Sequence, residues 1–337
     1  MRKHSKKPAE RVSGYVGIDL GDKKSRVCTL GEQGEVVAQE WVTTTPEAFF
    51  KRFSGPTNMR IAMEVGTHSR WASEVLKRCG QEVLVADARQ LALITNSNAK
   101  SDKRDARMLA QLVRADPRLL SPIEHRGEEL QRDLTLIHQR DNLVETRTRL
   151  ISSVRGVVKA SGARLPECPT GNFPQQVAGA IPEPLRAALA PTLEVIDQIN
   201  EQIYACDGTL EYWAQTRYTE SARLRQVNGV GTLTALAFLL TVGDKERFSR
   251  SRDIGSFLGL RPRLEQSGDS QPQLRITKAG DGYLRKTLVQ CAQHIVGPFG
   301  QDSDLRRWGL KVVAAGNGSK RAKQRAVDQE RRRTADL

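Results

Sequence analysis

The stretch that decides the fold is Tyr15-Val16-Gly17-Ile18-Asp19-Leu20-Gly21, a short apolar run that carries one carboxylate near its end. Apolar and β-branched residues bounded by glycines predict a strand over residues 13–20. Asp19 stands between two glycines of this run, where a strand can present a carboxylate from the edge of a sheet. The chain is therefore expected to begin with a β-sheet that bears an acidic group.

Four further runs of the same kind follow, with turn residues such as Gly31, Gly34 and Gly80 between them. The expected strands are 25–31, 35–42, 60–65 and 82–87, and the expected helices are 67–79, 88–96 and 102–114. This alternation predicts a mixed α/β layer domain over residues 11–120, in which the first three strands form a meander.

From Leu130 onward the hydrophobic period becomes helical. Apolar residues recur at steps of three, four or seven from Leu130 to Val158, and a second series runs from Leu189 to Trp213. The prolines of residues 161–184 predict an extended connection between the two series, because proline cannot continue a helix. We expect a two-helix arm over residues 121–220, antiparallel or coiled. An ordinary helical subdomain, an oligomerisation arm and a clamp on nucleic acid all fit this pattern.

The third region, residues 221–315, is predicted to be a mainly α-helical domain. It begins with Val227-Asn228-Gly229-Val230-Gly231 ahead of an apolar helix, and this stretch resembles a helix-hairpin-helix turn. In such a turn Gly229 and Gly231 would expose backbone N–H groups to a phosphate. The alternative is that the glycines only cap two helices. Residues 316–337 are expected to be a basic tail or polar helix that contacts phosphates nonspecifically, and a solvated tail with no binding role is the alternative.

Composition favours a soluble protein with an anionic partner. Among 337 residues, 53 Lys and Arg against 39 Asp and Glu give a net charge of +14. Nucleic acid is the leading partner, because each neutralised phosphate releases counterions, and an anionic membrane surface is the weaker alternative. The sequence offers neither a long apolar span nor a secretory signal, so a cytoplasmic location is expected, with association with the nucleoid on DNA binding. The five scattered cysteines predict neither a disulfide framework nor a zinc site.

Four carboxylates suggest a divalent-metal site. Asp19 stands in the middle of a predicted strand and Glu64 ends another. Asp102 and Asp105 lie three residues apart, so both would project from one face of a helix's first turn. Mg²⁺ prefers carboxylate oxygens and water, and phosphodiester cleavage by metal ions needs several such ligands together. The alternatives are a turn residue at Asp19 and electrostatic stabilisation of a helix N-terminus. A sugar-kinase or actin-type ATPase also opens with a similar strand, but the second glycine-rich phosphate loop it requires is absent from this sequence.

A second candidate site is Ser267-Gly268 in the segment 259–285. A serine on a glycine turn is sterically open, and neighbouring cations can bind a scissile phosphate and its transition state. No histidine stands nearby, which argues against a protease-like triad and suits attack on phosphorus. A plain turn is the alternative. The cations expected to contact nucleic acid here are Arg261, Arg263, Arg275, Lys278 and Arg285.

These motifs, in this order, are similar to those of the IS-one-ten class of insertion-sequence transposases. The resemblance covers about residues 13–300. It rests on Gly17-Ile18-Asp19, Met63-Glu64, Lys100-Ser101-Asp102-Lys103-Arg104-Asp105-Ala106, the Gly229 turn, Gly259-Leu260-Arg261-Pro262, Ser267-Gly268 and Ile276-Thr277-Lys278-Ala279-Gly280-Asp281.

The resemblance implies a ribonuclease-H-like (RuvC-like) domain in which Asp19, Glu64, Asp102 and Asp105 form a DEDD set that binds Mg²⁺. It further implies a coiled-coil arm and a serine domain in which Ser267 attacks DNA and forms a covalent phosphoserine intermediate. It also implies a homo-oligomer that is a dimer of dimers, and a structured bridge RNA that pairs with donor and target DNA.

The chain departs from the family pattern in three places. Leu274 stands where relatives have a glycine, Ser270 is a second serine beside Ser267, and residues 322–337 are unusually polar. The spacing from Ile276 favours Ser267 as the nucleophile. Two other functions are consistent with the residues. One is a Holliday-junction-like endonuclease that uses the four carboxylates and water, and the other is a non-enzymatic nucleic-acid-binding protein.

Overall fold

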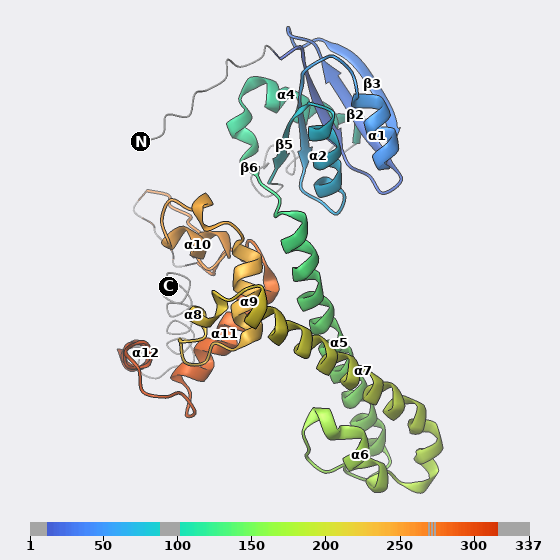
Figure 1. The fold of residues 1–337 in the computed structure, drawn as a ribbon, viewed down its shortest axis with the longest axis vertical. Helices are drawn as coiled ribbons and strands as arrows, with labels where there is room; N and C mark the ends of the chain where they lie inside the picture. Colours follow the sequence, from blue (N-terminus) through green and yellow to red (C-terminus); the bar gives the residue numbers. More distant parts are fainter. Residues whose placement is uncertain (1–11, 88–101, 269, 271, 273, 316–337) are drawn as a thin grey trace. The chain divides into compact units, whose positions relative to one another are not determined.

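The computed structural model describes residues 12–87, 102–268, 270, 272 and 274–315 (Figure 1). The chain divides into two compact units, Met1–His125 and Arg126–Leu337. The helix expected over residues 88–96 and the tail expected over residues 316–337 lie outside the described residues.

The first unit contains a six-stranded sheet in the order β3-β2-β1-β4-β5-β6. β1, β2 and β3 are antiparallel neighbours, which confirms the predicted meander, and β1, β4 and β5 are parallel. The elements of this unit are β1 (Gly14–Asp19), β2 (Lys24–Leu30), β3 (Val36–Thr43), α1 (Pro46–Phe53), β4 (Met59–Glu64), α2 (Ser69–Arg78), β5 (Glu82–Ala86), α4 (Asp102–Ala115), the 3-10 helix η1 (Pro117–Leu120) and β6 (Pro122–Ile123).

Helices cover both faces of the sheet. On one face, Val16 and Ile18 of β1 pack in a buried cluster with residues of α1 and α2, such as Phe49 and Leu76. On the other face α4 crosses β1 at Gly17 so closely that a Cβ atom there would lie 1.9 Å from the carbonyl oxygen of Ala106. Glycine is the residue that permits this contact between two backbones.

The direction of α4 follows from contacts at its two ends. Arg114, in its last turn, donates a hydrogen bond to the carbonyl of Glu32, beyond the end of β2. In the antiparallel β1–β2 pair that end lies beside the start of β1, since Tyr15 is opposite Leu30. Because Ala106 lies over Gly17, α4 runs antiparallel to β1. Its first turn therefore extends toward the carboxyl end of β1, where Asp19 lies.

Helix α1 was absent from the sequence expectations, although the chain signals its start. Thr45 accepts a hydrogen bond from the backbone N–H of Ala48, and Pro46 occupies the first turn. Both are common features of helix N-termini. The helix buries Phe49 and Phe53 against the sheet.

The arm belongs to the second unit and consists of α5 (Glu128–Ala160) and α7 (Glu183–Thr216). Arg140 of α5 pairs with Asp207 of α7 at 2.5 Å, and Arg147 donates to Asn200 at 2.8 Å. As the residue number rises along α5, the number of its partner on α7 falls, so the two helices are antiparallel. This is one of the two arrangements that the sequence predicted.

The expectation of an extended connection over residues 161–184 is wrong in part. This segment contains η2 (Thr170–Asn172), α6 (Phe173–Val177) and η3 (Ala178–Ala180), and its Phe173 and Ile181 are buried against the ends of α5 and α7. Proline is compatible with the first turn of a helix, where its missing N–H would have no partner. Pro174 and Pro184 occupy such positions.

The remaining elements of the second unit are mainly helical, as expected. One buried cluster joins α5 and α7 to the helices that follow, through residues such as Leu134, Leu210, Leu236 and Leu284. These helices are α8 (Ser221–Leu224), α9 (Thr232–Val242), η4 (Lys245–Arg247), α10 (Arg252–Phe257), α11 (Gly282–Val296) and α12 (Asp304–Ala315). All five cysteines are unpaired. No helix in the described part of the chain combines the length and apolar character needed to cross a bilayer.

Candidate functional sites

The two strand carboxylates lie side by side. β1 and β4 are parallel, and Ile18 is opposite Met63 in their register, so Asp19 and Glu64 occupy the next pair of positions. Neighbouring strands are about 4.8 Å apart. Alternation along each strand places both carboxylates on the face that α4 covers, because Gly17 and Ala62 of the same strands contact that helix. Both side chains are half-buried.

Asp102 and Asp105 belong to the first turn of α4. They precede the buried residues Ala106 and Leu109 at helical spacing, so they continue the face that α4 turns toward the sheet. Asp102 is exposed and Asp105 is half-buried. The topology thus brings the four predicted carboxylates to one end of one sheet face.

The carboxylates are of the type that a hard divalent cation prefers. Among the residues that the structure describes, however, no group of three or more His, Cys, Asp or Glu side chains lies close enough to hold a metal ion. The residue types and their places in the fold fit a metal site. In this structure, however, the side chains of the described residues are not close enough together to coordinate one ion.

The row of Asp19 and Glu64 continues across the sheet to two residues that sequence reasoning missed. Asp19 is opposite Arg26 of β2, and Arg26 is opposite Trp41 of β3. The guanidinium of Arg26 lies over the Trp41 ring at 5.1 Å from its centroid. Only the strand register reveals this neighbourhood, because the four residues are far apart in sequence.

Ser267 lies at the tip of a hairpin between residues 259 and 278, whose described residues pair at isolated bridges, Pro262 with Ile276 and Ser267 with Ser270. Backbone hydrogen bonds join Arg263 to Arg275 and Thr277 to Arg261, and at the tip Ser267 and Ser270 exchange two more. Gly268 has φ +54°, a left-handed conformation that glycine adopts without strain. The hairpin leaves Ser267 exposed.

Three of the predicted phosphate-binding arginines share one face of this hairpin. Arg263 is directly opposite Arg275, and Arg261 precedes Arg263 by two residues. All three are exposed, and none forms an ion pair with a carboxylate that the structure describes. Like charges opposite each other are destabilising in a β ladder, so the cluster favours an anion.

The base of the hairpin is tightly packed. Gly259 and Gly280 have positive φ, and a Cβ atom on either would lie within 2.2 Å of a backbone atom. Arg285 of α11 donates to the carbonyls of Leu258, Ala279 and Gly280, on both sides of this base. Lys278 is exposed with φ 56°, and its N–H donates to the carbonyl of Gly259. Arg285 therefore contacts protein backbone in this structure.

The predicted helix-hairpin-helix turn lies between α8 and α9. Gly229 has φ +88° and packs against Ile295 and His294 of α11, whereas Gly231 is the N-cap of α9 and has open space around its Cα. Packing against α11 therefore requires a glycine at position 229. Gly231, by contrast, leaves the N-terminus of α9 accessible.

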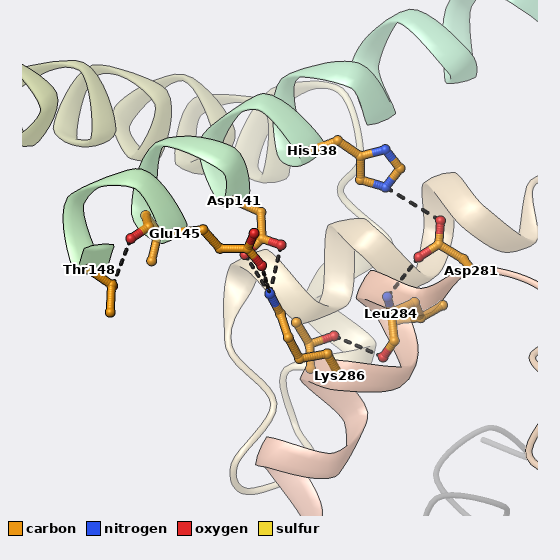
Figure 2. Close-up of polar contacts among 9 residues, drawn as sticks. His138, Asp141, Glu145, Thr148, Asp281, Leu284 and Lys286 are labelled. Carbon is orange, nitrogen blue, oxygen red and sulfur yellow. Dashed lines mark hydrogen bonds and ion pairs between the residues drawn. The ribbon is translucent and has the colours of Figure 1, made fainter. Parts of the chain in front are cut away.

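A polar groove of about 670 Å³ lies between α5 and α11. Figure 2 shows Lys286 reaching from α11 to Asp141 and Glu145 of α5, and His138 facing Asp281, with 3.4 Å between Nε2 and Oδ2. Burial alone would raise the pKa of Asp281. The His138 imidazole, the Leu284 amide and the charge of Arg126 outweigh this effect and lower that pKa below 3.8. Burial also raises the pKa of Tyr283, which lines the groove beside Lys286.

Comparisons with known proteins identify the family of the chain. Residues 16–161 match the model of the DEDD domain of IS110 transposases, described as "Transposase", and residues 221–304 match the model "Transposase IS116/IS110/IS902 family". The chain is 25% identical over 319 residues to the transposase of insertion sequence element IS1111A from Coxiella burnetii, covering 91% of this chain and 84% of the relative.

Two further relatives match at similar length. A probable family 20 transposase of Pseudomonas aeruginosa is 28% identical, with 87% of each chain covered. The transposase of element IS1328 from Yersinia enterocolitica is 25% identical, with 82% of each chain covered. The chain belongs to the IS110/IS116 family of insertion-sequence transposases.

Proposed function

We propose that this transposase cleaves and rejoins DNA strands through a covalent intermediate on Ser267. The observation that carries the proposal is the hairpin, which presents Ser267 at an exposed tip while Arg261, Arg263 and Arg275 line one face of its stem. An exposed hydroxyl is accessible to a phosphodiester, and guanidinium groups bind phosphate and stabilise the added negative charge of its transition state.

The reaction is a transesterification that needs no external energy source. The Ser267 Oγ attacks phosphorus, its proton is released, and the bond from phosphorus to one sugar oxygen breaks. That oxygen takes up a proton and leaves as a free hydroxyl. A hydroxyl of a second strand then attacks the phosphoserine, which restores the serine and joins the strands.

We further propose that Asp19, Glu64, Asp102 and Asp105 hold a divalent cation, Mg²⁺, in a ribonuclease-H-like domain. Support comes from the adjacent strand positions of Asp19 and Glu64 and from the first turn of α4 at the same end of the sheet. When bound, such a cation polarises a phosphoryl oxygen and stabilises a leaving oxygen. The four carboxylates would hold and orient that cation.

Three partners complete the proposal: DNA, RNA and further copies of this chain. The charge of +14 supports binding of DNA and of a structured bridge RNA, since both are polyanions. Exposed apolar residues along the arm support a homo-oligomer, a dimer of dimers held together through the paired helices. These residues are Val157, Val195, Tyr204 and Tyr212.

The test is an adduct assay. Purified protein is incubated with end-labelled element-junction DNA, Mg²⁺ and RNA transcribed from the element's flanks, and products are resolved on a denaturing gel before and after protease treatment. We expect a protease-sensitive DNA–protein species that is lost in Ser267→Ala. Ser270→Ala is the matched control, because Ser270 is also exposed and pairs with Ser267 across the same turn, and it should keep the adduct.

Other outcomes identify the alternatives. Free nicks that need Mg²⁺ and persist in Ser267→Ala indicate an endonuclease that uses water and the carboxylates. DNA binding with neither nicks nor adduct, unchanged in Asp19→Ala and Ser267→Ala, indicates a non-enzymatic role. Omitting the RNA tests its requirement, and light scattering of the complex measures the number of subunits.

A further inference from the structure

The row of residues beside the strand carboxylates suggests a nucleotide-binding site. Four residues stand in register across four adjacent strands: Glu64 on β4, Asp19 on β1, Arg26 on β2 and Trp41 on β3. Cross-strand partners project to the same face of a sheet. All four side chains therefore lie on the sheet face that α4 covers, at the end of the sheet where α4 begins. Trp41 is two strand spacings from Asp19, or roughly 10 Å.

Independent contacts confirm which face Arg26 and Trp41 occupy. Gln39 of β3 contacts the sulfur of Cys28, and Cys28 packs with Ala106 and Ala110 of α4. Arg26 and Trp41 are each two residues from this pair, so they share its face, beyond the N-terminal end of α4.

Trp41 is unusually placed for a structural residue. It lies on β3, the edge strand of the sheet, and 51% of its surface is exposed although the Arg26 guanidinium covers part of the ring. An exposed tryptophan on a basic protein offers a stacking surface, since every nucleobase has a π-face. The contact with Arg26 fixes the ring without closing it off.

Arg26 provides the complementary charge. It forms no ion pair with any carboxylate of the described residues, and its Nε is covered yet lacks a hydrogen-bond acceptor among them. Arg26 and a bound metal ion are both positively charged, so Arg26 would oppose metal binding at the neighbouring carboxylates. A bound anion between them would remove this repulsion. A phosphate next to the metal-bound one satisfies Arg26 and leaves its base beside Trp41.

We propose that Arg26 and Trp41 bind the nucleotide next to the phosphate on which the carboxylates act, with its base stacked on Trp41 and its phosphate against Arg26. The ligand is a single-stranded or unpaired segment of DNA, because a base inside a duplex exposes no face for stacking. This inference rests on the proposed function and deepens it, since it assigns substrate contacts to the carboxylate site.

The test is a photocrosslink on the full chain carrying Ser267→Ala, in EDTA, so that neither cleavage nor an adduct is required. A single-stranded DNA oligonucleotide containing 5-iodouracil is crosslinked, and the protein is digested with trypsin. The peptide 27–51 contains Trp41 and no other tryptophan. We expect the label on Trp41 of this peptide.

Variants make the result quantitative. Trp41→Ala should lower the crosslink to peptide 27–51 at least 5-fold, whereas Trp41→Phe should keep DNA binding at this site. Val37→Ala is the matched control, because Val37 is exposed on the same strand, and it should leave the yield unchanged. Arg26→Ala should make the dependence of log K on log salt shallower by about 0.7, the value for one contact to a single strand.

Three results would overturn the proposal. They are a label outside peptide 27–51, an equal yield in Trp41→Ala, and displacement of the label by RNA of the same sequence but not by unlabelled DNA. The assay is independent of the adduct assay. A missing crosslink with an intact adduct refutes only the nucleotide site, and a Trp41 crosslink without adduct or nicks refutes only the proposed reaction.

Discussion

The ammonium nitrogen of Lys286 on α11 lies 2.7 Å and 2.6 Å from the two carboxylate oxygens of Asp141 on α5 (Figure 2). This ion pair links α11, whose Arg285 contacts the base of the Ser267 hairpin, to α5 of the arm. Asp141 is the more buried partner, with 20% of its side chain exposed against 41% for Lys286.

Removing the cation should therefore destabilise the second unit. We expect Lys286→Met to lower the free energy of unfolding by about 1 kcal/mol, because a half-buried carboxylate loses its closest partner. Urea denaturation at low salt measures the change, and high salt should reduce it because salt screens the pair. Lys311→Met, at an exposed position of α12, is the control. An equal effect of the two substitutions would contradict a specific role for the pair.

Asp281 should make stability depend on pH in the acid range. Its folded-state pKa is lowered below 3.8, so the carboxylate form is favoured by folding. Such a group contributes stability above its unfolded pKa, and the contribution is lost as pH falls through the folded pKa. Asp281→Asn keeps a side chain able to cap α11 but removes the charge facing His138 and Arg126.

We expect the Asn variant to be about 1 kcal/mol less stable than the wild type near pH 7, and the difference to shrink as the pH falls below the ordinary pKa of an aspartate. Thermal unfolding across this range provides the measurement. A difference that stays constant with pH would show that the side chain acts through packing and not through its charge.

Gly17 should be intolerant of any side chain. A Cβ atom there would meet the backbone of α4 at Ala106 and Ala110, which cannot move without separating the helix from the sheet. We expect Gly17→Ala to cost about 2 kcal/mol or more and to disturb the placement of Asp105 beside the strand carboxylates. Gly55→Ala, whose nearest neighbouring atom would be 3.8 Å away, should be nearly neutral. Similar melting temperatures for both variants would contradict the close contact.

The sequence predicted those parts of the fold that have a clear hydrophobic period. The strands of the meander alternate or form apolar runs, and the buried residues of α5 and α7 recur at helical spacing, so both could be recognised. The hairpin over residues 259–278 was missed although its stem alternates, with arginines on one face and Leu260, Pro262 and Ile276 on the other. The alternating runs are short and one contains a proline, so they gave only a weak strand signal.

Site residues could be predicted from the sequence only where the residue type itself suggests a chemical role. Carboxylates in predicted strands and a serine on a glycine turn suggested Asp19, Glu64 and Ser267, whose roles stay predictions. Arg26 and Trp41 gave no such signal. Their place beside Asp19 follows from pairing across three strands, which depends on the register of the whole sheet.

Arg285 holds the two sides of the hairpin base together. Its guanidinium donates to Leu258 at 3.1 Å and to Gly280 at 3.0 Å, and also to Ala279. All three contacts are made by Nη1, at the end of a rigid planar guanidinium, whereas the lysine side chain is one bond shorter and ends in a flexible ammonium that does not place a donor at the same position. We expect Arg285→Lys to loosen the hairpin while the helical core stays folded.

Hydrogen exchange detects this directly. The amides of Arg263 and Thr277, which bond across the hairpin, should exchange faster in Arg285→Lys, and those of α9 should keep their protection. Because a misplaced nucleophile reacts slowly, the rate of adduct formation should fall by about 10-fold or more. Arg252→Lys, at an exposed position of α10, should change neither quantity. Faster exchange with an unchanged adduct rate would show that the hairpin base is structural and does not position Ser267, whereas unchanged exchange would show that Arg285 does not hold the hairpin at all.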